Sequence, residues 1–195
     1  MKGNFWQYYI TFEEDVDRLF RYIEPTTDNY KVYSVELTRL YLAICSEIDV
    51  IFKAYCNLLA NDRNPKNIKQ YAEIILNADK SVCSEEVKFY KYNYIFAPFA
   101  EWTPTNSPLW WKKHNDVKHD RDKNYKQANL ENVLDALSGL YLLNLLYYHE
   151  GETAFNRKLG FDTPLEQTSW LLKSRYEVFQ LHSPFLGFYK PETNG

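Results

Sequence analysis

Apolar residues recur at helical spacing along most of the chain, and the first such run begins near residue 11. Residues 11–14 read Thr-Phe-Glu-Glu, which has the form of a capping box at a helix start. The apolar positions that follow are Phe12, Val16, Leu19, Phe20 and Ile23. Glu24 and Pro25 stop the pattern, so we predict a first helix that is capped by Thr11 and ends there.

The clearest amphipathic pattern begins after Ser34, a residue suited to cap a helix. Its apolar stripe consists of Leu37, Leu40, Tyr41, Ile44, Ile48, Ile51, Phe52, Tyr55 and Leu59. A polar stretch that ends in Pro65 breaks this second helix. Four further apolar positions predict a third helix over residues 68–77, namely Ile68, Tyr71, Ile74 and Ile75.

Between residues 82 and 99 the pattern changes to the alternation typical of a strand or small hairpin. The positions concerned are Val87 and Phe89, followed by Tyr90, Tyr92, Tyr94 and Phe96. Pro98, Pro104 and Pro108 then enclose a loop. Pro108 can serve as the first residue of a helix that carries residues 110–121.

The most apolar helix is predicted to begin at Asn129, as its cap, and to run to about His149. Its stripe consists of Leu130, Val133, Leu134, Leu137, Leu140 and Tyr141. Beyond Leu140 the pattern is apolar nearly all round, which indicates a helix in the centre of the core or in a subunit interface. We expect this helix to end at residues 150–152. A weaker helical pattern follows, carried by Leu165, Trp170, Leu171, Tyr176 and Phe179.

These elements predict a mainly α fold, a helical bundle with a small β-hairpin or irregular insertion before the helix that carries residues 110–121. The 195 residues suit a single domain. We place this domain at residues 1–182 and an irregular tail at residues 183–195. Hydrophobic residues make up 45% of the chain and charged residues 25%, which is typical of a folded globular protein and not of a disordered one.

Composition also bears on the compartment. Cys45, Cys56 and Cys83 are odd in number and lack metal-type spacing, which indicates a reducing compartment and no zinc site. The first residues become acidic and aromatic where a signal peptide would be continuously apolar. The most apolar run, residues 140–148, is far shorter than the ~20 residues that span a bilayer. We therefore expect a cytoplasmic protein that does not enter a membrane.

Residues 110–126, which we call the basic segment, differ in charge from the rest of the chain. The segment holds six Lys or Arg and three Asp, a local charge of +3 in a chain of net charge −3. Phosphate is the natural ligand for such a contrast. On an ideal helix, Lys112, Asn115 and His119 share one face. The opposite face, which we expect to anchor the helix, holds Trp110, His114, Val117 and Arg121.

RNA is the phosphate ligand that this segment favours, because its 2′-hydroxyl supplies a nucleophile and the protein need add only a proton carrier and cations. His119 is the candidate proton carrier, since an imidazole titrates near neutral pH. Lys112 and Asn115 are the candidates for holding the phosphate. The candidate RNA-binding residues are Lys113, His114, Lys118 and Arg121, with Trp111 and Tyr125 to stack on bases.

Two structural interpretations of the basic segment, without any function, stay open. A charge-rich helix start is usually a solvated surface, and adjacent tryptophans more often anchor a core than bind bases. The aspartates that alternate with the cations point in diverging directions on a helix, so we expect no metal and no cofactor. The chain also lacks the phosphate-loop, dinucleotide-binding, serine-hydrolase and zinc-peptidase motifs.

Residues 114–119, His-Asn-Asp-Val-Lys-His, stand in front of a long apolar helix, and in this setting the chain resembles the HEPN superfamily of small helical proteins. Nuclease members carry an Arg, four to six intervening residues and a His. The resemblance implies metal-independent RNA cleavage by paired motifs across a dimer, typically in toxin–antitoxin or phage-defence systems. It covers roughly residues 37–51 in character and residues 110–146 in pattern.

The chain departs from the HEPN motif at the arginine. With His119 as the motif histidine, the three positions where the Arg would stand hold His114, Lys113 and Lys112. Lysine keeps the charge but lacks the planar fork that matches two phosphate oxygens. Lys112 is the best substitute, because it lies within about 20° of His119 around an ideal helix. The tyrosine that some members place two residues after the His is replaced by Arg121.

We therefore expect a HEPN-like endoribonuclease that needs no metal and works as a homodimer or HEPN pair, with an antitoxin or defence-complex protein as a further partner. A second hypothesis is a catalytically inactive RNA-binding or assembly subunit, which the missing arginine favours. A third is a helical scaffold in which the basic segment is only a solvated helix start.

Overall fold

The computed structural model of the chain describes residues 4–61, 63–157, 165, 167–168, 172–174 and 176–182. It is mainly helical with a small antiparallel sheet, as predicted. The α-helices are α1 (Phe5–Leu19), α2 (Val35–Leu59), α3 (Ile68–Ala78), α4 (Leu109–His119), α5 (Arg121–Asn124) and α6 (Leu130–Arg157). The strands are β1 (Glu86–Phe89), β2 (Tyr94–Phe96) and β3 (Phe179–His182). Short 3-10 turns lie at Thr27–Asn29, Lys80–Cys83, Tyr90–Tyr92 and Tyr125–Gln127.

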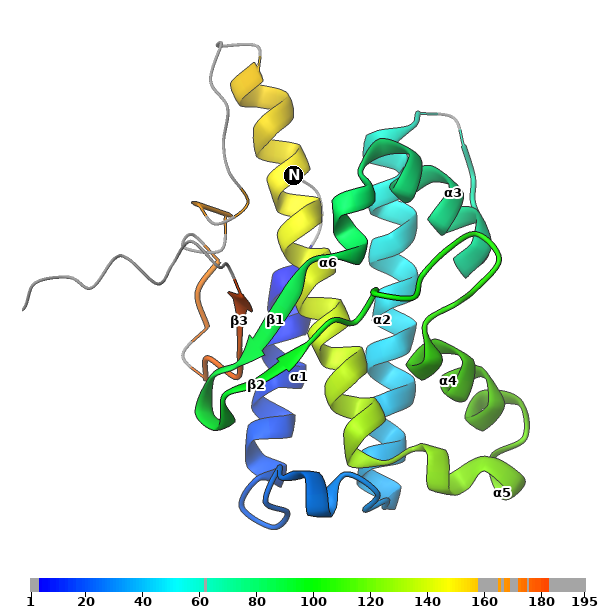
Figure 1. Cartoon of the computed structure of the whole chain (residues 1–195), viewed down its shortest axis with the longest axis vertical. Helices are drawn as coiled ribbons and strands as arrows, with labels where there is room; N and C mark the ends of the chain where they lie inside the picture. The colour runs from blue at the N-terminus through cyan, green and yellow to red at the C-terminus, as the bar shows by residue number, and fades with distance from the viewer. Residues whose placement is uncertain are drawn as a thin grey trace, which may run out of the picture.

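Helices α1, α2 and α6 run side by side and form the body of the molecule, with α3, α4 and α5 on the side away from α1 (Figure 1). The predicted stripe of α2 faces α6 and is buried from Leu37 to Tyr55. Ser34 caps α2 as predicted, because its hydroxyl accepts the N–H of Leu37 at 3.1 Å. The clear helical period of α2 therefore marks the face that builds the core.

Helix α6 is the central element of the fold. Asn129 caps it as predicted, with its side-chain oxygen accepting the N–H of Asn132 at 3.1 Å. Its residues are buried nearly all round between Leu140 and Leu146, which confirms the core alternative for this helix. The predicted end at residues 150–152 is wrong, since the helix continues to Arg157. A glycine inside a helix costs only about 1 kcal/mol relative to alanine, so Gly151 is not a sufficient stop signal.

The predicted start of the first helix is wrong as well. Helix α1 already begins at Phe5, and the Thr11 hydroxyl donates to the carbonyl of Gln7 at 3.0 Å as an ordinary mid-helix side chain. The reason is that the buried stripe continues upstream of the apparent capping box, through Trp6 and Tyr9. The Tyr9 hydroxyl donates to the buried carboxylate of Glu13 at 2.8 Å, which holds the two adjacent turns together.

The sheet has the order β2-β1-β3, and it contains the hairpin that the alternating pattern predicted. Val87 in the central strand lies opposite Phe96 on one side and Leu181 on the other. Asn93 closes the hairpin with a left-handed backbone, φ 57°, a conformation that asparagine adopts more readily than most residues. The sheet lies in front of α1 and α6 in the view of Figure 1.

Strand β3 corrects the prediction for the C-terminal part, because Phe179 belongs to a strand and not to a helix. Its pairing with β1 supplies backbone partners from a distant part of the chain, which a local helical pattern does not reveal. The Val178 N–H donates to Glu13 at 2.9 Å and so ties the start of β3 to α1. Trp170, Leu171 and the tail at residues 183–195 lie outside the described residues.

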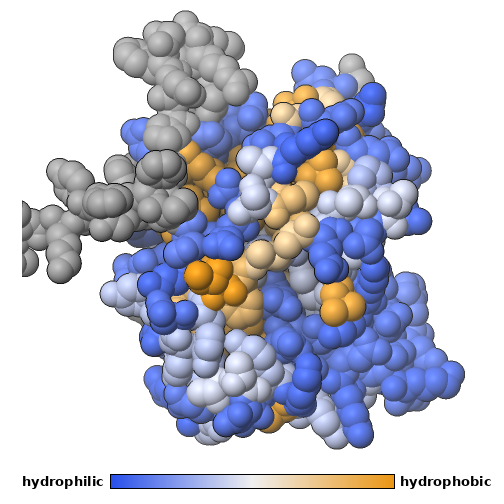
Figure 2. Space-filling model, viewed as in Figure 1, coloured by the Kyte–Doolittle hydropathy of each residue, from blue (hydrophilic) through white to orange (hydrophobic). Residues whose placement is uncertain are grey.

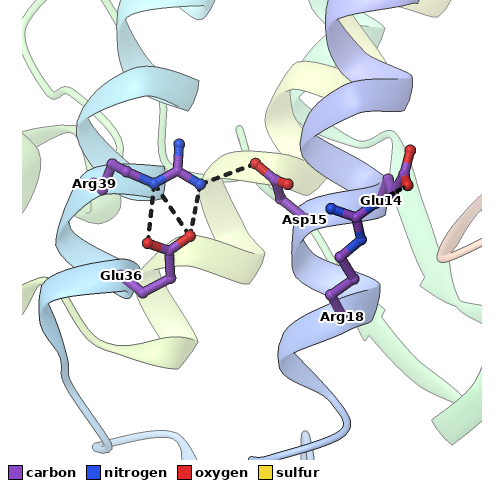
Figure 3. Close-up of polar contacts among 5 residues, drawn as sticks. All are labelled: Glu14, Asp15, Arg18, Glu36 and Arg39. Carbon is purple, nitrogen blue, oxygen red and sulfur yellow. Dashed lines mark hydrogen bonds and ion pairs between the residues drawn. The ribbon is translucent and has the colours of Figure 1, made fainter.

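A polar contact on the surface joins α1 to α2 (Figure 3). The Arg39 guanidinium donates to Asp15 at 3.0 Å and to Glu36 at 2.6 Å, so a single cation bridges two carboxylates on different helices. Exposed ion pairs of this kind contribute about 0–1 kcal/mol, and the buried stripes therefore dominate the packing of the two helices. No helix among the described residues combines the length and the apolar character needed to cross a bilayer.

Candidate functional site

Helix α4 is anchored to the core by its first turn. The Tyr41 hydroxyl donates to the carbonyl of Trp110, and the indole N–H of Trp110 donates to the carbonyl of Pro98 at 2.9 Å. A Cβ added at Gly139 of α6 would lie 3.2 Å from the Trp110 ring, so the missing side chain allows α4 to approach closely. Pro108 precedes the first residue of α4, one position from the predicted start.

The buried face of α4 agrees with the prediction, since Trp110, His114 and Val117 are all buried. The helix ends at His119, however, because the backbone leaves helical geometry at Asp120, with φ −145° and ψ 69°. Arg121 therefore begins α5, and its predicted place on the anchored face of the same helix is wrong.

Lys112 and His119 are both exposed, and Asn115 between them is half-buried. The Lys112 ammonium donates to the side-chain oxygen of Asn106 at 2.7 Å, near the start of the helix. Two turns of helix separate the backbone of Lys112 from that of His119, a rise of about 10 Å. The two candidates for a single phosphate thus share a face but not a position along it.

Lys113 points toward α6, where its ammonium lies 3.4 Å from the side-chain oxygen of Asn132. Burial and the nearby charge of Glu131 raise the pKa of Asp135 to about 7, against the opposing charge of Lys113. Lys113 is therefore engaged with the core helix and not with open solvent.

The two aromatic candidates also have partners within the fold. Trp111 is 7% exposed and packs against Phe52 and His114, at ring distances of 6.3 and 5.3 Å. The Tyr125 ring lies edge-on to Tyr33 at 5.4 Å. Both rings help to pack the basic segment against the rest of the molecule.

A pocket of about 490 Å³ lies between α2, α4 and the start of α3, and we call it the α2–α4 pocket. Helix α4 contributes Trp111, His114, Asn115 and Lys118. Helix α2 contributes Leu42, Cys45, Ser46 and Asp49, and the start of α3 adds Lys66, Asn67 and Ile68. The structure thus brings together four of the predicted site residues, whereas Lys112, Lys113, His119, Arg121 and Tyr125 do not line this pocket.

His114 is the most unusual group of the α2–α4 pocket. It is 4% exposed, its ring lies edge-on to Tyr41 at 5.9 Å, and its Nδ1 is buried without a hydrogen-bond partner among the described residues. Burial, together with the charges of Lys118 and His119, lowers the pKa of His114 to about 4. The imidazole is therefore neutral at physiological pH, with one ring nitrogen able to accept and the other to donate.

The single carboxylate of the pocket is already engaged. One oxygen of Asp49 accepts the Tyr71 hydroxyl at 2.8 Å, and the other pairs with Lys53, which confirms the predicted i, i+4 pair in α2. Among the described residues, neither Lys66 nor Lys118 forms an ion pair. The charges left unpaired in this pocket, among the described residues, are therefore those of Lys66 and Lys118.

Lys66 and Asn67 were missed by sequence reasoning. Asn67 caps α3, since its side-chain oxygen accepts the N–H groups of Lys69 and Gln70 at 3.2 and 3.1 Å. The sequence could have predicted this cap, because Asn67 directly precedes an apolar helical pattern. The sequence could not have predicted that Asn67 lies near α4, because this proximity depends on how α3 packs against α2.

The surface around α4 and α5 is hydrophilic, as Figure 2 shows at the lower right of the molecule. Lys118, Arg121 and Lys126 are exposed there, and none of them pairs with a carboxylate of the described residues. Lys123 does so, with its ammonium 2.8 Å from Asp120. Three cations of the basic segment are thus available to an external anion.

The remaining histidines lie outside the basic segment. His149 Nδ1 lies 3.3 Å from the Thr168 hydroxyl, and His182 Nε2 lies 3.6 Å from a carboxylate oxygen of Glu86. No three His, Cys, Asp or Glu side chains of the described part of the chain are grouped so that they could hold a metal ion.

Comparison of the chain with family models, with curated proteins and with solved structures found no match. The likeness to HEPN proteins therefore depends on the residues quoted from the sequence, and the function is argued below from the geometry of the basic segment.

Proposed function

We propose that the protein acts on RNA as a HEPN-like, metal-independent endoribonuclease, with the end of α4 and the start of α5 as its RNA-binding surface. The observation that carries the proposal is the exposed imidazole of His119 next to Lys118 and Arg121, two cations that pair with no carboxylate in the described part of the chain. Unpaired surface cations attract the phosphates of a nucleic acid and give up bound counterions to do so.

The chemistry needs only groups that this surface offers. His119 takes the proton from a ribose 2′-hydroxyl, whose oxygen attacks the neighbouring phosphorus. The bond from phosphorus to the 5′-oxygen breaks, and that oxygen receives a proton from an imidazolium, leaving a 2′,3′-cyclic phosphate and a 5′-hydroxyl. Lys118 and Arg121 offset the negative charge that grows on the phosphate oxygens. Asn115 lies one turn before His119, and Lys112, two turns away, reaches a neighbouring phosphate.

A second copy of the chain is part of this proposal, because HEPN motifs work in pairs across a dimer. The resemblance also suggests a toxin–antitoxin or defence setting, in which a partner protein controls the nuclease. A dimer places two imidazoles at one cleft, so that one accepts the 2′-proton while the other donates to the leaving oxygen.

The test is to incubate the purified protein with total RNA in the presence of a chelator and to identify the new ends. We expect 2′,3′-cyclic phosphate ends with wild type and at least a 100-fold loss of rate for His119→Ala, the order of magnitude of general acid–base catalysis. His182→Ala is the matched control, because that histidine lies in β3 beside Glu86. Equal cleavage by wild type and His119→Ala would overturn the catalytic assignment.

The second candidate is a non-catalytic RNA-binding or assembly module, and one observation favours it. Lys112, the only substitute for the motif arginine on the face of His119, lies two turns of helix before that histidine and donates to the side-chain oxygen of Asn106. This candidate predicts RNA binding that weakens as salt rises but yields no new RNA ends. Lys118→Glu with Arg121→Glu should abolish that binding, whereas Lys80→Glu, at an exposed lysine after α3, should not.

A further inference from the structure

A pocket between α1, α6 and β3 carries an inference that goes beyond the proposed function, and we call it the α1–β3 pocket. Its volume is about 260 Å³. Helix α1 and strand β3 lie on the opposite side of the molecule from α4 and α5 (Figure 1). The buried lining of this pocket includes one carboxylate, that of Glu13, and three aromatic rings, those of Trp6, Tyr141 and Phe179. An acidic group among aromatic rings is an environment that suits a cation.

Glu13 is the group that points to a ligand. Its side chain is fully buried, and its Oε1 accepts the Tyr9 hydroxyl at 2.8 Å and the Val178 N–H at 2.9 Å. Its other oxygen, Oε2, is buried without a hydrogen-bond partner among the described residues. A buried oxygen without a partner costs free energy, and native structures rarely keep such a group without a reason. A ligand that brings a donor into the pocket gives Oε2 the missing partner.

The charge of the pocket favours a positively charged donor. Glu13 forms no ion pair with any residue that the structure describes. The other two charged residues that line the pocket, Lys173 and Glu177, are exposed, and their charges cancel. An ionised Glu13 therefore leaves the pocket with one net negative charge, which lies on its buried side.

The surroundings of Glu13 are balanced between the neutral acid and the carboxylate. Burial raises the pKa of Glu13, which favours the neutral acid. Four polar groups nearby lower the pKa and favour the carboxylate, namely the hydroxyls of Ser174 and Tyr9 and the N–H groups of Val178 and Phe179. Ser174 acts through its proximity, because Oε2 forms no hydrogen bond. A cation next to Oε2 shifts this balance to the carboxylate.

We propose that the α1–β3 pocket binds a small aliphatic amine in its protonated form. The ammonium group donates an N–H to Oε2 of Glu13 in a charge-assisted hydrogen bond. The rings of Trp6 and Tyr141, 6.1 Å apart, and of Phe179, 6.4 Å from Tyr141, attract the cation and offer apolar surface to its alkyl chain. The volume of about 260 Å³ lies just below the range of roughly 300–1,000 Å³ that is usual for drug-sized ligands, so it suits a smaller molecule.

The first experiment is calorimetric titration of the purified full chain with pentylamine and with cadaverine, the diamine of the same chain length. We expect at least one of them to bind with a dissociation constant below about 1 mM. Pentanol, which has no charge, should bind at least about tenfold more weakly, and pentyltrimethylammonium, which has the charge but no N–H, at least about fivefold more weakly. Failure of both amines to bind, or equal binding of either control ligand, overturns the proposal.

Glu13→Gln locates the ligand, because it keeps the shape of the side chain and an acceptor for Tyr9 and Val178 but removes the charge. We expect this variant to remain folded by circular dichroism and to bind the amine at least about tenfold more weakly. Glu14→Gln is the matched control on the same helix, since Glu14 pairs with Arg18 and does not line the pocket. It should change binding by less than about twofold. Unchanged binding by folded Glu13→Gln overturns the proposal.

Lys173→Glu tests the charge of the pocket at an exposed position, where a substitution does not disturb the core. It replaces a cation that repels the ammonium group by an anion that attracts it. We expect it to bind the amine at least about twofold more tightly than wild type. This variant decides the matter even if Glu13→Gln does not fold, because unchanged or weaker binding by Lys173→Glu overturns the proposal.

The ammonium group has two natural sources, a monoamine or a diamine. Glu177, the second carboxylate of the pocket, is placed to attract the far end of a diamine. Tighter binding of cadaverine than of pentylamine, with the difference lost in Glu177→Gln, indicates a diamine. Equal binding of the two amines indicates a monoamine. None of the residues of this pocket belongs to the basic segment, so the amine and RNA proposals can fail separately.

Discussion

At the scale of single residues, His114 shows how a site can conflict with the stability of the fold. Its ring is enclosed by Tyr41 and Trp111, yet Nδ1 has no partner among the described residues. A buried polar atom without a partner costs about 1–3 kcal/mol, so packing alone would favour an apolar ring of similar shape.

His114 also makes stability depend on pH. Its pKa is about 4 in the folded chain and about 6.5 in an unfolded one, so the unfolded state binds more protons between these values. The free energy of unfolding therefore falls as the pH decreases through this window, by up to roughly 3 kcal/mol from this group. Asp135, whose pKa is raised to about 7, acts in the opposite direction over much of the same range.

We predict that His114→Phe removes the acid-sensitive part of the stability. Urea unfolding at about pH 7 and about pH 5 should show that the variant gains stability relative to wild type as the pH falls. The contribution of Asp135 is present in both proteins and cancels in the difference. Parallel pH profiles for the two proteins would show that the histidine is not protonated selectively in the unfolded state.

At the scale of elements, the caps that sequence could predict are those with a local signal. Ser34 and Asn129 each precede a strong apolar pattern, and each caps its helix. The apparent cap at Thr11 is wrong because the buried stripe continues upstream, and the stop at residue 151 is wrong because burial of α6 outweighs one glycine. Strand β3 could not be predicted, since its hydrogen-bonding partner, β1, lies far away in the sequence.

We predict that Asn129→Ala destabilises the protein by about 1 kcal/mol, because the variant leaves the N–H of Asn132 without its cap. The measurement is the midpoint of chemical unfolding. Asn77→Ala, at an exposed asparagine in the last turn of α3, is the control and should change stability by less than about 0.5 kcal/mol. Similar losses of stability for both variants would contradict a stabilising role for the Asn129 cap of α6.

At the scale of the whole molecule, α2 and α6 form the main interface of the core, with α4 packed against both helices and the sheet against α6. Ile48 is fully buried in this interface, whereas Val50, two residues on, is 48% exposed. We predict that Ile48→Ala lowers the free energy of unfolding by about 2–5 kcal/mol and Val50→Ala by less than about 1 kcal/mol. Equal losses in a thermal or urea titration would contradict the packing described for α2.

The packing of whole elements explains why only the α4 side of the α2–α4 pocket could be predicted. Trp111, His114, Asn115 and Lys118 stand close together in the sequence, and their charge and aromatic character marked them as candidates. Lys66 and Asn67 join them only because α3 packs against α2, which no local pattern encodes. The sequence also placed Lys112 and His119 correctly on one face, but it could not show that Asn106 holds Lys112.

The order of strands has a consequence for how the chain is made. Strand β1 is central, and one of its neighbours, β3, leaves the ribosome about ninety residues after it. Throughout that interval β1 and β2 exist as a two-stranded hairpin with an open edge, a form that is marginally stable in water and prone to pair with other chains. A nascent chain stalled before residue 179 is thus expected to be an aggregation-prone species and a substrate for chaperones.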